Sequence, residues 1–335
     1  MRILKYLSIL ERALTPNHPL HAQWFITRRC NYKCKTCNVW EAQEKNEIGL
    51  EETLYGLDVL RDLGVAEITF SGGNPLLRDD IGEILRYSSK HFITTIYDNG
   101  SMIKKRIEDL KYVDFVAISL DSLEEEKQDY IKGVEGSFRD AIESAKLLRK
   151  EGIKFAFSTT ISNLNLEEII PMVRCFERIG VPFNLSFIGF DYNSDSLFSF
   201  GKKVDEFVIK DKEKAVKVIE ELKNLGKKAP LLLPLESLDE LEHYIQTRKR
   251  KHACGALKNF LMLDHLGRIS GCHLKEPVST IYDIKDFWYS EEAEKIRREN
   301  ERCNACSYIC YLSYSLPLRA FVRPLLIGIR TKKKY

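Results

Sequence analysis

Six short apolar runs rich in β-forming residues alternate with helix-like stretches over the first half of this 335-residue chain. The runs cover residues 21–27, 66–72, 91–98, 113–121, 153–161 and 182–189. Helical patterns at 50–64, 137–152 and 165–180 lie between them, and each ends on a glycine, a common helix terminator. This alternation predicts an α/β fold with a parallel sheet, which right-handed crossovers curl into a barrel or part-barrel.

The pattern changes after the sixth run. The stretches 211–226 and 236–251 are charged and helical, and a cysteine-rich region begins near residue 254. We therefore predict an N-terminal amphipathic helix, a partial (β/α)6 TIM-type barrel, a helical connector, a small C-terminal cysteine-rich hairpin module and a basic apolar tail. Their expected ranges are 1–20, 21–195, 196–250, 251–312 and 313–335.

Composition limits the compartment and the partners. The net charge is only +3, so the charge balance does not call for nucleic acid as a partner. No apolar run reaches the ~18 residues of a membrane-spanning helix, and the first 14 residues lack the apolar core of a secretory signal. We therefore expect a cytoplasmic protein in a reducing compartment. There, clustered cysteines are more often metal ligands or catalytic groups than disulfides.

Three of the nine cysteines, Cys30, Cys34 and Cys37, follow the first run directly with the spacing CxxxCxxC. Sites in such barrels lie at the C-terminal ends of the strands, where this loop would be. Thiolates bind zinc and iron–sulfur clusters. A structural zinc takes four protein ligands, whereas three thiolates on a four-iron cluster leave one iron open for a substrate or cofactor. The spacing alone also allows a zinc site with a fourth ligand elsewhere.

In its place after a strand and before a β/α pattern, the motif resembles that of the radical S-adenosylmethionine (SAM) enzymes. The resemblance covers about residues 21–195. It implies that the three cysteines hold a [4Fe–4S] cluster whose fourth iron is chelated by SAM. It further implies reductive cleavage of SAM to a 5′-deoxyadenosyl radical, which abstracts hydrogen from an unactivated C–H bond, and an electron donor such as flavodoxin or ferredoxin.

Four more segments resemble the SAM-binding motifs of this family: "SGGNP" (71–75), "YDNG" (97–100), "SLDS" (119–122) and "YIKGVEGSF" (130–138). Asn74 stands where the family usually has Glu, so its amide accepts a hydrogen bond but brings no charge. Lys132 stands where Arg is common and can pair with the SAM carboxylate as a point charge. The glycines would let the backbone approach SAM. The implied SAM contacts are Gly72, Gly73, Asn74, Pro75, Asn99, Ser119, Asp121 and Lys132.

A second cysteine region begins with Cys254 and Cys272, which flank Gly267 as C-x12-G-x4-C around a predicted hairpin at 259–273. Cys303, Cys306 and Cys310 follow with the spacing CxxCxxxC. From the residues alone this set suits structural zinc as well as iron–sulfur. The nearby histidines that suit zinc are His252, His265 and His273.

The C-terminal pattern resembles the SPASM/twitch extension found on many radical SAM enzymes. Because only five cysteines follow residue 250, the resemblance implies one auxiliary [4Fe–4S] cluster. Its implied ligands are Cys254, Cys272, Cys303 and Cys306, with Cys310 as an alternative ligand. The remaining cysteine, Cys175, is expected on a helix in the core.

Both ends of the chain combine apolar and basic residues. The N-terminal stretch places Ile3, Leu4, Leu7, Leu10 and Leu14 on one helical face, and the stretch 314–335 mixes Leu, Phe and Ile with Arg and Lys. Such ends suit peripheral contact with anionic lipid. Packing on the body or self-association is the alternative.

The sequence leaves the substrate open among a peptide, a lipid or isoprenoid, and a small metabolite. Only about 20 residues precede the first strand, without a peptide-docking segment, and the basic apolar ends favour a lipid. We therefore predict hydrogen abstraction from a lipid, isoprenoid or small metabolite rather than a peptide, and assign no residue a direct catalytic role. The alternatives are addition of the deoxyadenosyl group to an alkene and a non-catalytic zinc or iron–sulfur scaffold. Suggested substrate contacts are Asn184, Ser186, Phe190 and Tyr192.

Overall fold

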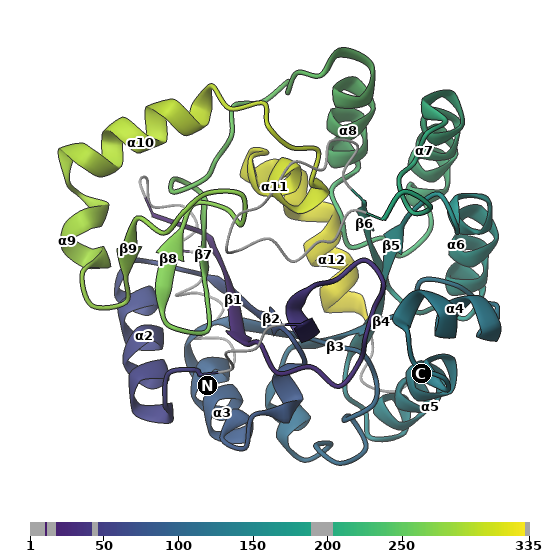
Figure 1. The fold of residues 1–335 in the computed structure, drawn as a ribbon, viewed down its shortest axis with the longest axis horizontal. Helices are drawn as coiled ribbons and strands as arrows, with labels where there is room; N and C mark the ends of the chain where they lie inside the picture. Colours follow the sequence, from purple (N-terminus) through teal and green to yellow (C-terminus); the bar gives the residue numbers. More distant parts are fainter. Residues whose placement is uncertain (1–10, 12–17, 42–45, 189–203, 332–335) are drawn as a thin grey trace.

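A curved sheet surrounded by helices organises the computed structural model, which describes Glu11 and residues 18–41, 46–188 and 204–331 (Figure 1). The sheet has nine strands in the order β6-β5-β4-β3-β2-β1-β7-β8-β9. Strands β1 to β6 are parallel and pair in chain order. The predicted α/β fold with a partial (β/α)6 barrel is therefore confirmed.

Each predicted run forms a strand whose ends lie within two residues of the expected ones. The strands are β1 (His21–Thr27), β2 (Glu67–Gly72), β3 (Ile93–Asp98), β4 (Phe115–Ser119), β5 (Phe155–Ile161) and β6 (Phe183–Phe187). The intervening helices are α2 (Leu50–Asp62), α3 (Ile81–His91), α4 (Glu125–Lys132), α5 (Ser137–Lys150) and α6 (Ile169–Arg178). Short 3-10 helices are η1 (Val39–Glu41), η2 (Pro75–Leu77), η3 (Asp109–Tyr112) and η4 (Leu166–Glu168).

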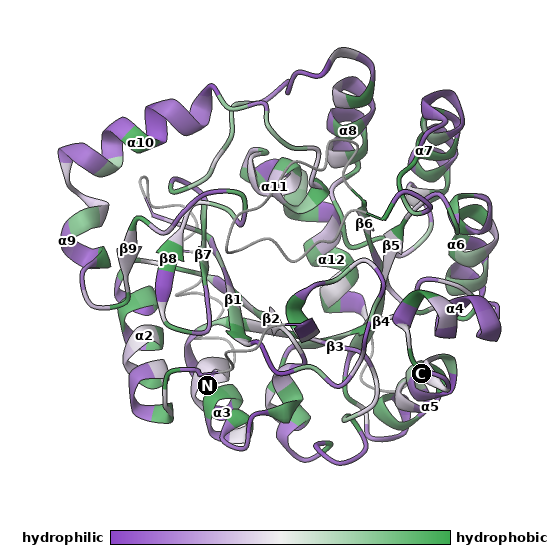
Figure 2. Ribbon diagram, viewed as in Figure 1, coloured by the Kyte–Doolittle hydropathy of each residue, from purple (hydrophilic) through white to green (hydrophobic). Residues whose placement is uncertain are grey.

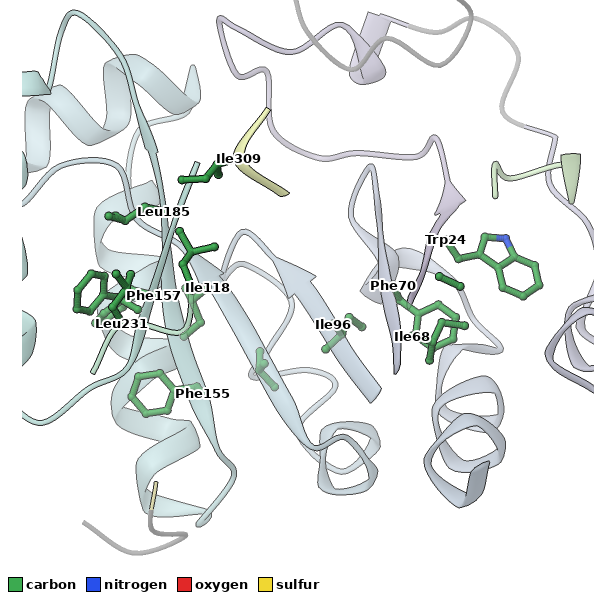
Figure 3. Close-up of a cluster of buried hydrophobic side chains, with 14 of the residues drawn as sticks. Trp24, Ile68, Phe70, Ile96, Ile118, Phe155, Phe157, Leu185, Leu231 and Ile309 are labelled. Carbon is green, nitrogen blue, oxygen red and sulfur yellow. The ribbon is translucent and has the colours of Figure 1, made fainter. Parts of the chain in front are cut away.

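The two faces of the barrel sheet differ in polarity. Because successive strand residues point to opposite faces, every second residue packs under the helices. On that side Trp24, Phe70 and Ile118 are fully buried in one apolar core (Figure 3). Besides the His21–Glu67 pair and the apolar Phe25, the concave face carries mainly neutral polar side chains, most of them partly exposed: Gln23, Thr69, Ser71, Thr95, Tyr97, Ser158, Thr160, Asn184 and Ser186. The barrel interior is thus lined by hydroxyl and amide groups rather than by branched apolar residues.

The cysteine-rich hairpin extends the barrel sheet. It consists of β7 (Phe260–Leu263) and β8 (Arg268–Ser270), followed by β9 (Ser279–Thr280). Strand β7 pairs in parallel with β1, from His21 opposite Phe260 to Trp24 opposite Leu263. The hairpin expected at 259–273 is confirmed, whereas its pairing with the first strand of the chain was not predicted. The domain ranges themselves stay predictions.

The remaining helices connect and cover this sheet. They are α7 (Lys212–Gly226), α8 (Leu235–Thr247), α9 (Ile284–Trp288), α10 (Glu291–Glu301), α11 (Ile309–Tyr314), η5 (Leu318–Phe321) and α12 (Val322–Arg330). Helix α10 is mostly hydrophilic, in keeping with its place at the periphery (Figure 2). Most of the predicted N-terminal helix lies outside the described residues. Within the described part of the chain, no helix has the length and apolarity that crossing a bilayer requires.

Trp24 joins the barrel to the hairpin. Its side chain is fully buried, and its indole N–H donates to the Asp264 carbonyl at 3.0 Å. We expect Trp24→Ala to lower the free energy of unfolding by about 3–5 kcal/mol, because it leaves a cavity and removes this hydrogen bond. Chemical denaturation followed by circular dichroism measures the change. Tyr289→Ala, at a side chain that is 66% exposed, should change it by less than about 0.5 kcal/mol. Equal effects would contradict the structural role of Trp24.

Candidate functional site

The loop with Cys30, Cys34 and Cys37 lies against the end of β2. The Gly73 N–H donates to the Thr27 carbonyl and the Asn74 N–H to the Arg29 carbonyl, both at 2.8 Å. A Cβ atom at Gly72 or Gly73 would lie closer than 3.0 Å to one of these two carbonyl oxygens. Gly72 also has a φ of +118°, which favours glycine. The two glycines are therefore required by the loop itself, a reason that the sequence argument did not give.

A second glycine segment contacts the loop. Gly133 ends α4 with a φ of +64°, and a Cβ atom there would overlap with the Lys33 carbonyl. Next to it, the Lys35 N–H donates to the Ile131 carbonyl at 3.0 Å. The segment 130–138, singled out for its resemblance to a SAM-binding motif, thus also holds the backbone of the cysteine loop.

Three asparagines connect the loop to the ends of two strands. The Asn74 side-chain amide donates to Asn31 at 3.3 Å and to Asn99 at 3.2 Å, and Asn99 donates to Asn31 at 3.0 Å. The Asn74 side-chain oxygen accepts from the Leu76 N–H at 2.9 Å. Asn74 is almost fully buried, and Pro75 follows it as the first residue of η2. Asn74 therefore fixes the geometry of the loop without adding charge.

Asp98, at the end of β3, is an acidic group that the sequence argument missed. It is 3% exposed, and one carboxylate oxygen accepts from the Gly100 N–H at 2.6 Å. The other oxygen is buried without a hydrogen-bond partner among the described residues. Burial raises the pKa of Asp98 to about 7, although Gly100 and Asn74 favour the charged form. The available signal was "YDNG", where an acid replaces the Thr of the family's Thr-Asn-Gly.

Asp121 and Lys132 were both expected to contact SAM, and the structure pairs them with each other. Their side chains lie 2.6 Å apart and are almost fully buried. Burial alone would lower the pKa of Lys132, but the Asp121 carboxylate and the nearby thiols raise it. Asp121 also accepts from the Thr160 N–H at 2.7 Å. Ser119 is partly exposed at the end of β4.

The three thiols of the loop are suited to a cluster. Burial raises the pKa of Cys30, that of Cys34 to about 11 and that of Cys37 to about 12. Bound metal replaces the thiol proton, so buried thiols favour a cationic ligand once it is present. No three His, Cys, Asp or Glu side chains in the described ranges converge as ligands of a single ion do. Three neighbouring thiols on one short loop fit the donor set of an iron–sulfur cluster.

The five C-terminal cysteines lie together. Cys254 and Cys306 are buried among Phe25, Phe260, Met262 and Tyr311, and the others pack against this group: Cys272, Cys303 and Cys310. A Cys310 thiolate would interact electrostatically with Cys306 and with Tyr97 on the concave face. Burial lowers the pKa of His273 to about 4, so this histidine is neutral. His252 instead pairs with Glu240 at 2.7 Å, and Cys175 lies on α6.

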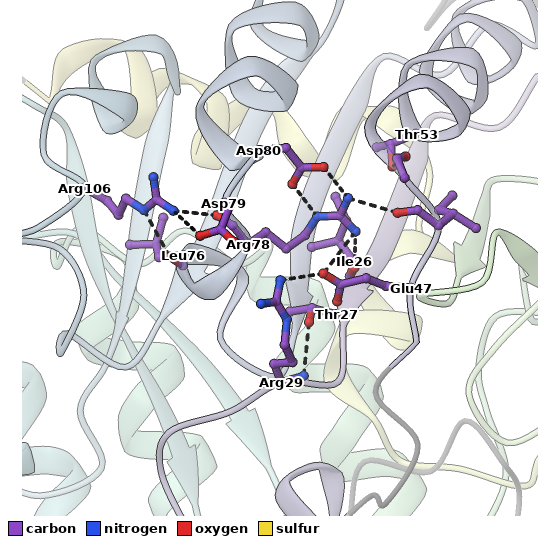
Figure 4. Close-up of polar contacts among 12 residues, drawn as sticks. Ile26, Thr27, Arg29, Glu47, Thr53, Leu76, Arg78, Asp79, Asp80 and Arg106 are labelled. Carbon is purple, nitrogen blue, oxygen red and sulfur yellow. Dashed lines mark hydrogen bonds and ion pairs between the residues drawn. The ribbon is translucent and has the colours of Figure 1, made fainter.

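A buried arginine that follows the "GGNP" segment contacts the backbone next to the start of the loop (Figure 4). The Arg78 guanidinium donates to the carbonyls of Ile26 and Ile48 at 3.0 Å, and makes a two-point contact with Asp80 at 2.9 and 2.7 Å. Nearby, Arg29 donates to Glu47 at 2.6 Å. Arg78 thus joins the end of η2 to the end of β1, directly before the cysteine loop. Nothing in the sequence pattern singled it out.

Comparison with known proteins agrees with this geometry. Residues 24–176 match the family model described as Radical SAM superfamily. This stretch is a radical SAM domain. The match supports the predicted enzyme class and the predicted catalytic cofactors, a [4Fe–4S] cluster and SAM. The cysteine-rich C-terminal module fits an auxiliary [4Fe–4S] cluster.

Curated relatives and solved structures extend the match beyond the barrel. The chain is 28% identical to the antilisterial bacteriocin subtilosin biosynthesis protein AlbA of Bacillus subtilis over 76% of this chain and 55% of AlbA. It is 33% identical to the Fe-coproporphyrin III synthase of Methanosarcina barkeri over 48% of this chain and 41% of that protein. Streptococcus suis SuiB bound to S-adenosylmethionine has the same fold, with a TM-score of 0.65 and 19% identity over 94% of this chain and 76% of SuiB. The chain thus spans about half the length of these curated relatives.

The contact between Gly73 and Arg29 can be tested through iron. We expect Gly73→Ala, after anaerobic reconstitution, to hold about four fewer irons than the unmodified chain, because the new Cβ would displace the cysteine loop. Gly49→Ala is the matched control, since a Cβ at Gly49 meets nothing within 4 Å. Iron and sulfide analysis measures the difference. An unchanged iron content in Gly73→Ala would show that the loop tolerates the displacement.

Proposed function

We propose that this radical SAM enzyme binds its catalytic cluster at Cys30, Cys34 and Cys37 and takes a hydrogen atom from a substrate held on the concave face of the barrel. The observation that carries the proposal is the packing of the cysteine loop between the Gly72–Asn74 segment and Gly133, at the C-terminal ends of the strands. When bound and reduced, the cluster and SAM supply one-electron chemistry at a C–H bond. An external donor such as ferredoxin or flavodoxin would provide the electron.

The SAM seat would be built from the ends of β2, β3 and β4. The backbone of Gly72, Gly73 and Asn74 faces the loop, with Pro75, Asn99 and Ser119 beside it. Because Asn74 lacks the usual carboxylate, a charge for the SAM ammonium must come from elsewhere. Asp98 supplies it, since its buried carboxylate lies next to Asn74 and has one oxygen without a partner among the described residues. The Lys132–Asp121 pair would then orient the SAM carboxylate side of the site.

The substrate would meet neutral hydrogen-bonding groups. On the concave face the Asn184 side-chain amide donates to the Tyr97 hydroxyl at 3.0 Å, and Gln23 donates to Ser71 at 3.1 Å. Thr160 and Ser186 form a third pair at 3.1 Å. These pairs use only part of the hydrogen-bonding capacity of their members, and a polar substrate can use the remainder, whereas a hydrocarbon chain cannot. Asn184 and Ser186 thus remain proposed substrate contacts, while Phe190 and Tyr192 lie outside the described residues.

These groups favour a neutral polar metabolite or a peptide segment over a hydrocarbon, and so weigh against the lipid part of the sequence prediction. The names of relatives favour a peptide: AlbA is a subtilosin biosynthesis protein, and SuiB has been seen bound to the precursor peptide SuiA. The length of chain before β1 is therefore a weak argument against peptides. We place a neutral polar substrate first, with a peptide segment as one member of that class.

The auxiliary cluster would use Cys254, Cys272, Cys303 and Cys306, with Cys310 as the alternative fourth ligand. All five thiols lie at the junction of the hairpin with α11, next to Phe25 on β1. Four thiolates close a cubane cluster against further ligands. Such a site suits electron transfer or structural support rather than substrate binding.

Iron content and SAM cleavage test the function together. Reconstituted under anaerobic conditions, the chain should hold about eight irons, and the triple variant Cys30→Ala, Cys34→Ala, Cys37→Ala about four. With dithionite as reductant, the unmodified chain should release 5′-deoxyadenosine from SAM and the triple variant none. Cys175→Ala is the control. Zinc without iron would overturn the proposal, and an adenosylated adduct in place of 5′-deoxyadenosine would replace hydrogen abstraction by addition.

Asp98→Asn tests the proposed seat through two opposite effects. The buried carboxyl has a raised pKa of about 7, so the folded state holds its proton more tightly than the unfolded state, and stability falls as the pH rises from about 4 to about 7. Between pH 5 and 8 the unmodified chain should lose roughly 3 kcal/mol through this group, and Asp98→Asn should not. SAM affinity at pH 8 should fall about tenfold to a hundredfold in the variant, because an ionic hydrogen bond is lost.

Denaturation of the cluster-free chain and equilibrium dialysis with SAM measure these two quantities. Asp79→Asn is the control, because the Asp79 side chain is 99% exposed. Unchanged SAM affinity in Asp98→Asn would contradict the proposed role in SAM binding. Asp98 would then have only a structural role, as the acceptor of the Gly100 N–H.

A further inference from the structure

Helix α12 carries an exposed apolar stripe. Val322, Leu325, Leu326 and Ile329 are 56%, 51%, 43% and 63% exposed. Their spacing of i, i+3, i+4 and i+7 places them on one face of the helix. In a helix of a water-soluble domain this face normally packs on the core, yet no residue of α12 is buried.

The opposite side of α12 is fixed to the body of the barrel. Gly328 lies against the Phe115 ring, and its carbonyl accepts from Lys154 at 2.8 Å. Arg323 donates to the Ala229 carbonyl at 2.8 Å and to the Leu231 carbonyl at 3.3 Å. These contacts determine which side of the helix faces the protein, so the stripe points away from it.

The C-terminal segment that carries the stripe has charge of one sign. After Glu301 the chain contains no Asp or Glu. The same segment holds seven cations: Arg302, Arg319, Arg323, Arg330, Lys332, Lys333 and Lys334. Apolar side chains next to Arg and Lys are the composition of helices that lie in the interface of an anionic bilayer. Stripe-to-stripe packing of two copies would instead bring two such cationic segments together, which like-charge repulsion opposes.

We infer that α12 docks this enzyme peripherally on an anionic lipid surface, with Val322, Leu325, Leu326 and Ile329 inserted among the headgroups. The helix meets the barrel at residues that begin strands, Phe115 of β4 and Lys154 just before β5. The cysteine loop lies at the other ends of the strands. The docked enzyme therefore turns its candidate active site away from the bilayer. This inference concerns a surface remote from the site and does not depend on the proposed substrate.

Vesicle flotation tests the docking surface. The reconstituted full chain is mixed with vesicles of phosphatidylcholine alone or of phosphatidylcholine and phosphatidylglycerol at 7:3. We expect binding to the anionic vesicles only, weakened by 0.5 M salt through screening. The double variant Leu325→Glu, Ile329→Glu should lower the partition coefficient at least tenfold. Ile179→Glu, at a side chain that is 41% exposed on the barrel, should leave it unchanged.

Folding and self-association are measured on the same samples. Equal iron content and unfolding midpoints in the double variant and the unmodified chain would exclude misfolding, and light scattering would give the oligomeric state. Should the midpoint fall, the milder Leu326→Ser is to be used in the same assay. A dimer that dissociates in the double variant, without vesicle binding, would overturn the inference in favour of a second copy. A monomer that binds neither kind of vesicle would overturn it as well.

Discussion

The close backbone contact between the end of β2 and the start of the cysteine loop is the constraint on which the site depends. Two backbone hydrogen bonds, from Gly73 to Thr27 and from Asn74 to Arg29, hold the two segments close together. The space between them leaves no room for a Cβ atom at positions 72 and 73. Gly133 imposes the same limit from α4. The cysteines therefore occupy a defined position at the end of the barrel.

Charge at the site is buried and nearly balanced. Lys132 and Asp121 form an ion pair whose hydrogen bonds extend to Thr160. Asp98 differs, because one of its oxygens has no partner in the described part of the chain and its pKa is raised. A buried group of this kind costs stability, and a cationic ligand would offset that cost. Under the proposed function, Asp98 would supply the negative charge that Asn74 lacks.

Much of the fold could be predicted because the six strands have strong local patterns. The end of each strand differs from expectation by two residues at most, and the hairpin around Gly267 was also found from its apolar runs. The cysteines were recognisable because their spacing is local. Arg78 was missed because its role comes from carbonyl groups that are distant in the sequence, whereas Asp98 had a local signal in "YDNG" but its burial is visible only in the fold. Lys132 and Asp121 were identified as site residues, but their pairing across 11 positions was not.

The sequence by itself determined the parallel barrel, the two groups of cysteines and the family motifs, because strand periodicity, ligand spacing and glycine positions are properties of short segments. Only the tertiary structure decided that β7 joins β1, that the glycines serve the cysteine loop, and that α12 presents its apolar stripe on the side opposite the barrel. Each of these depends on which surfaces meet when the sheet closes. Burial of the whole apolar core determines which surfaces meet, and this cannot be read from any short segment of the sequence.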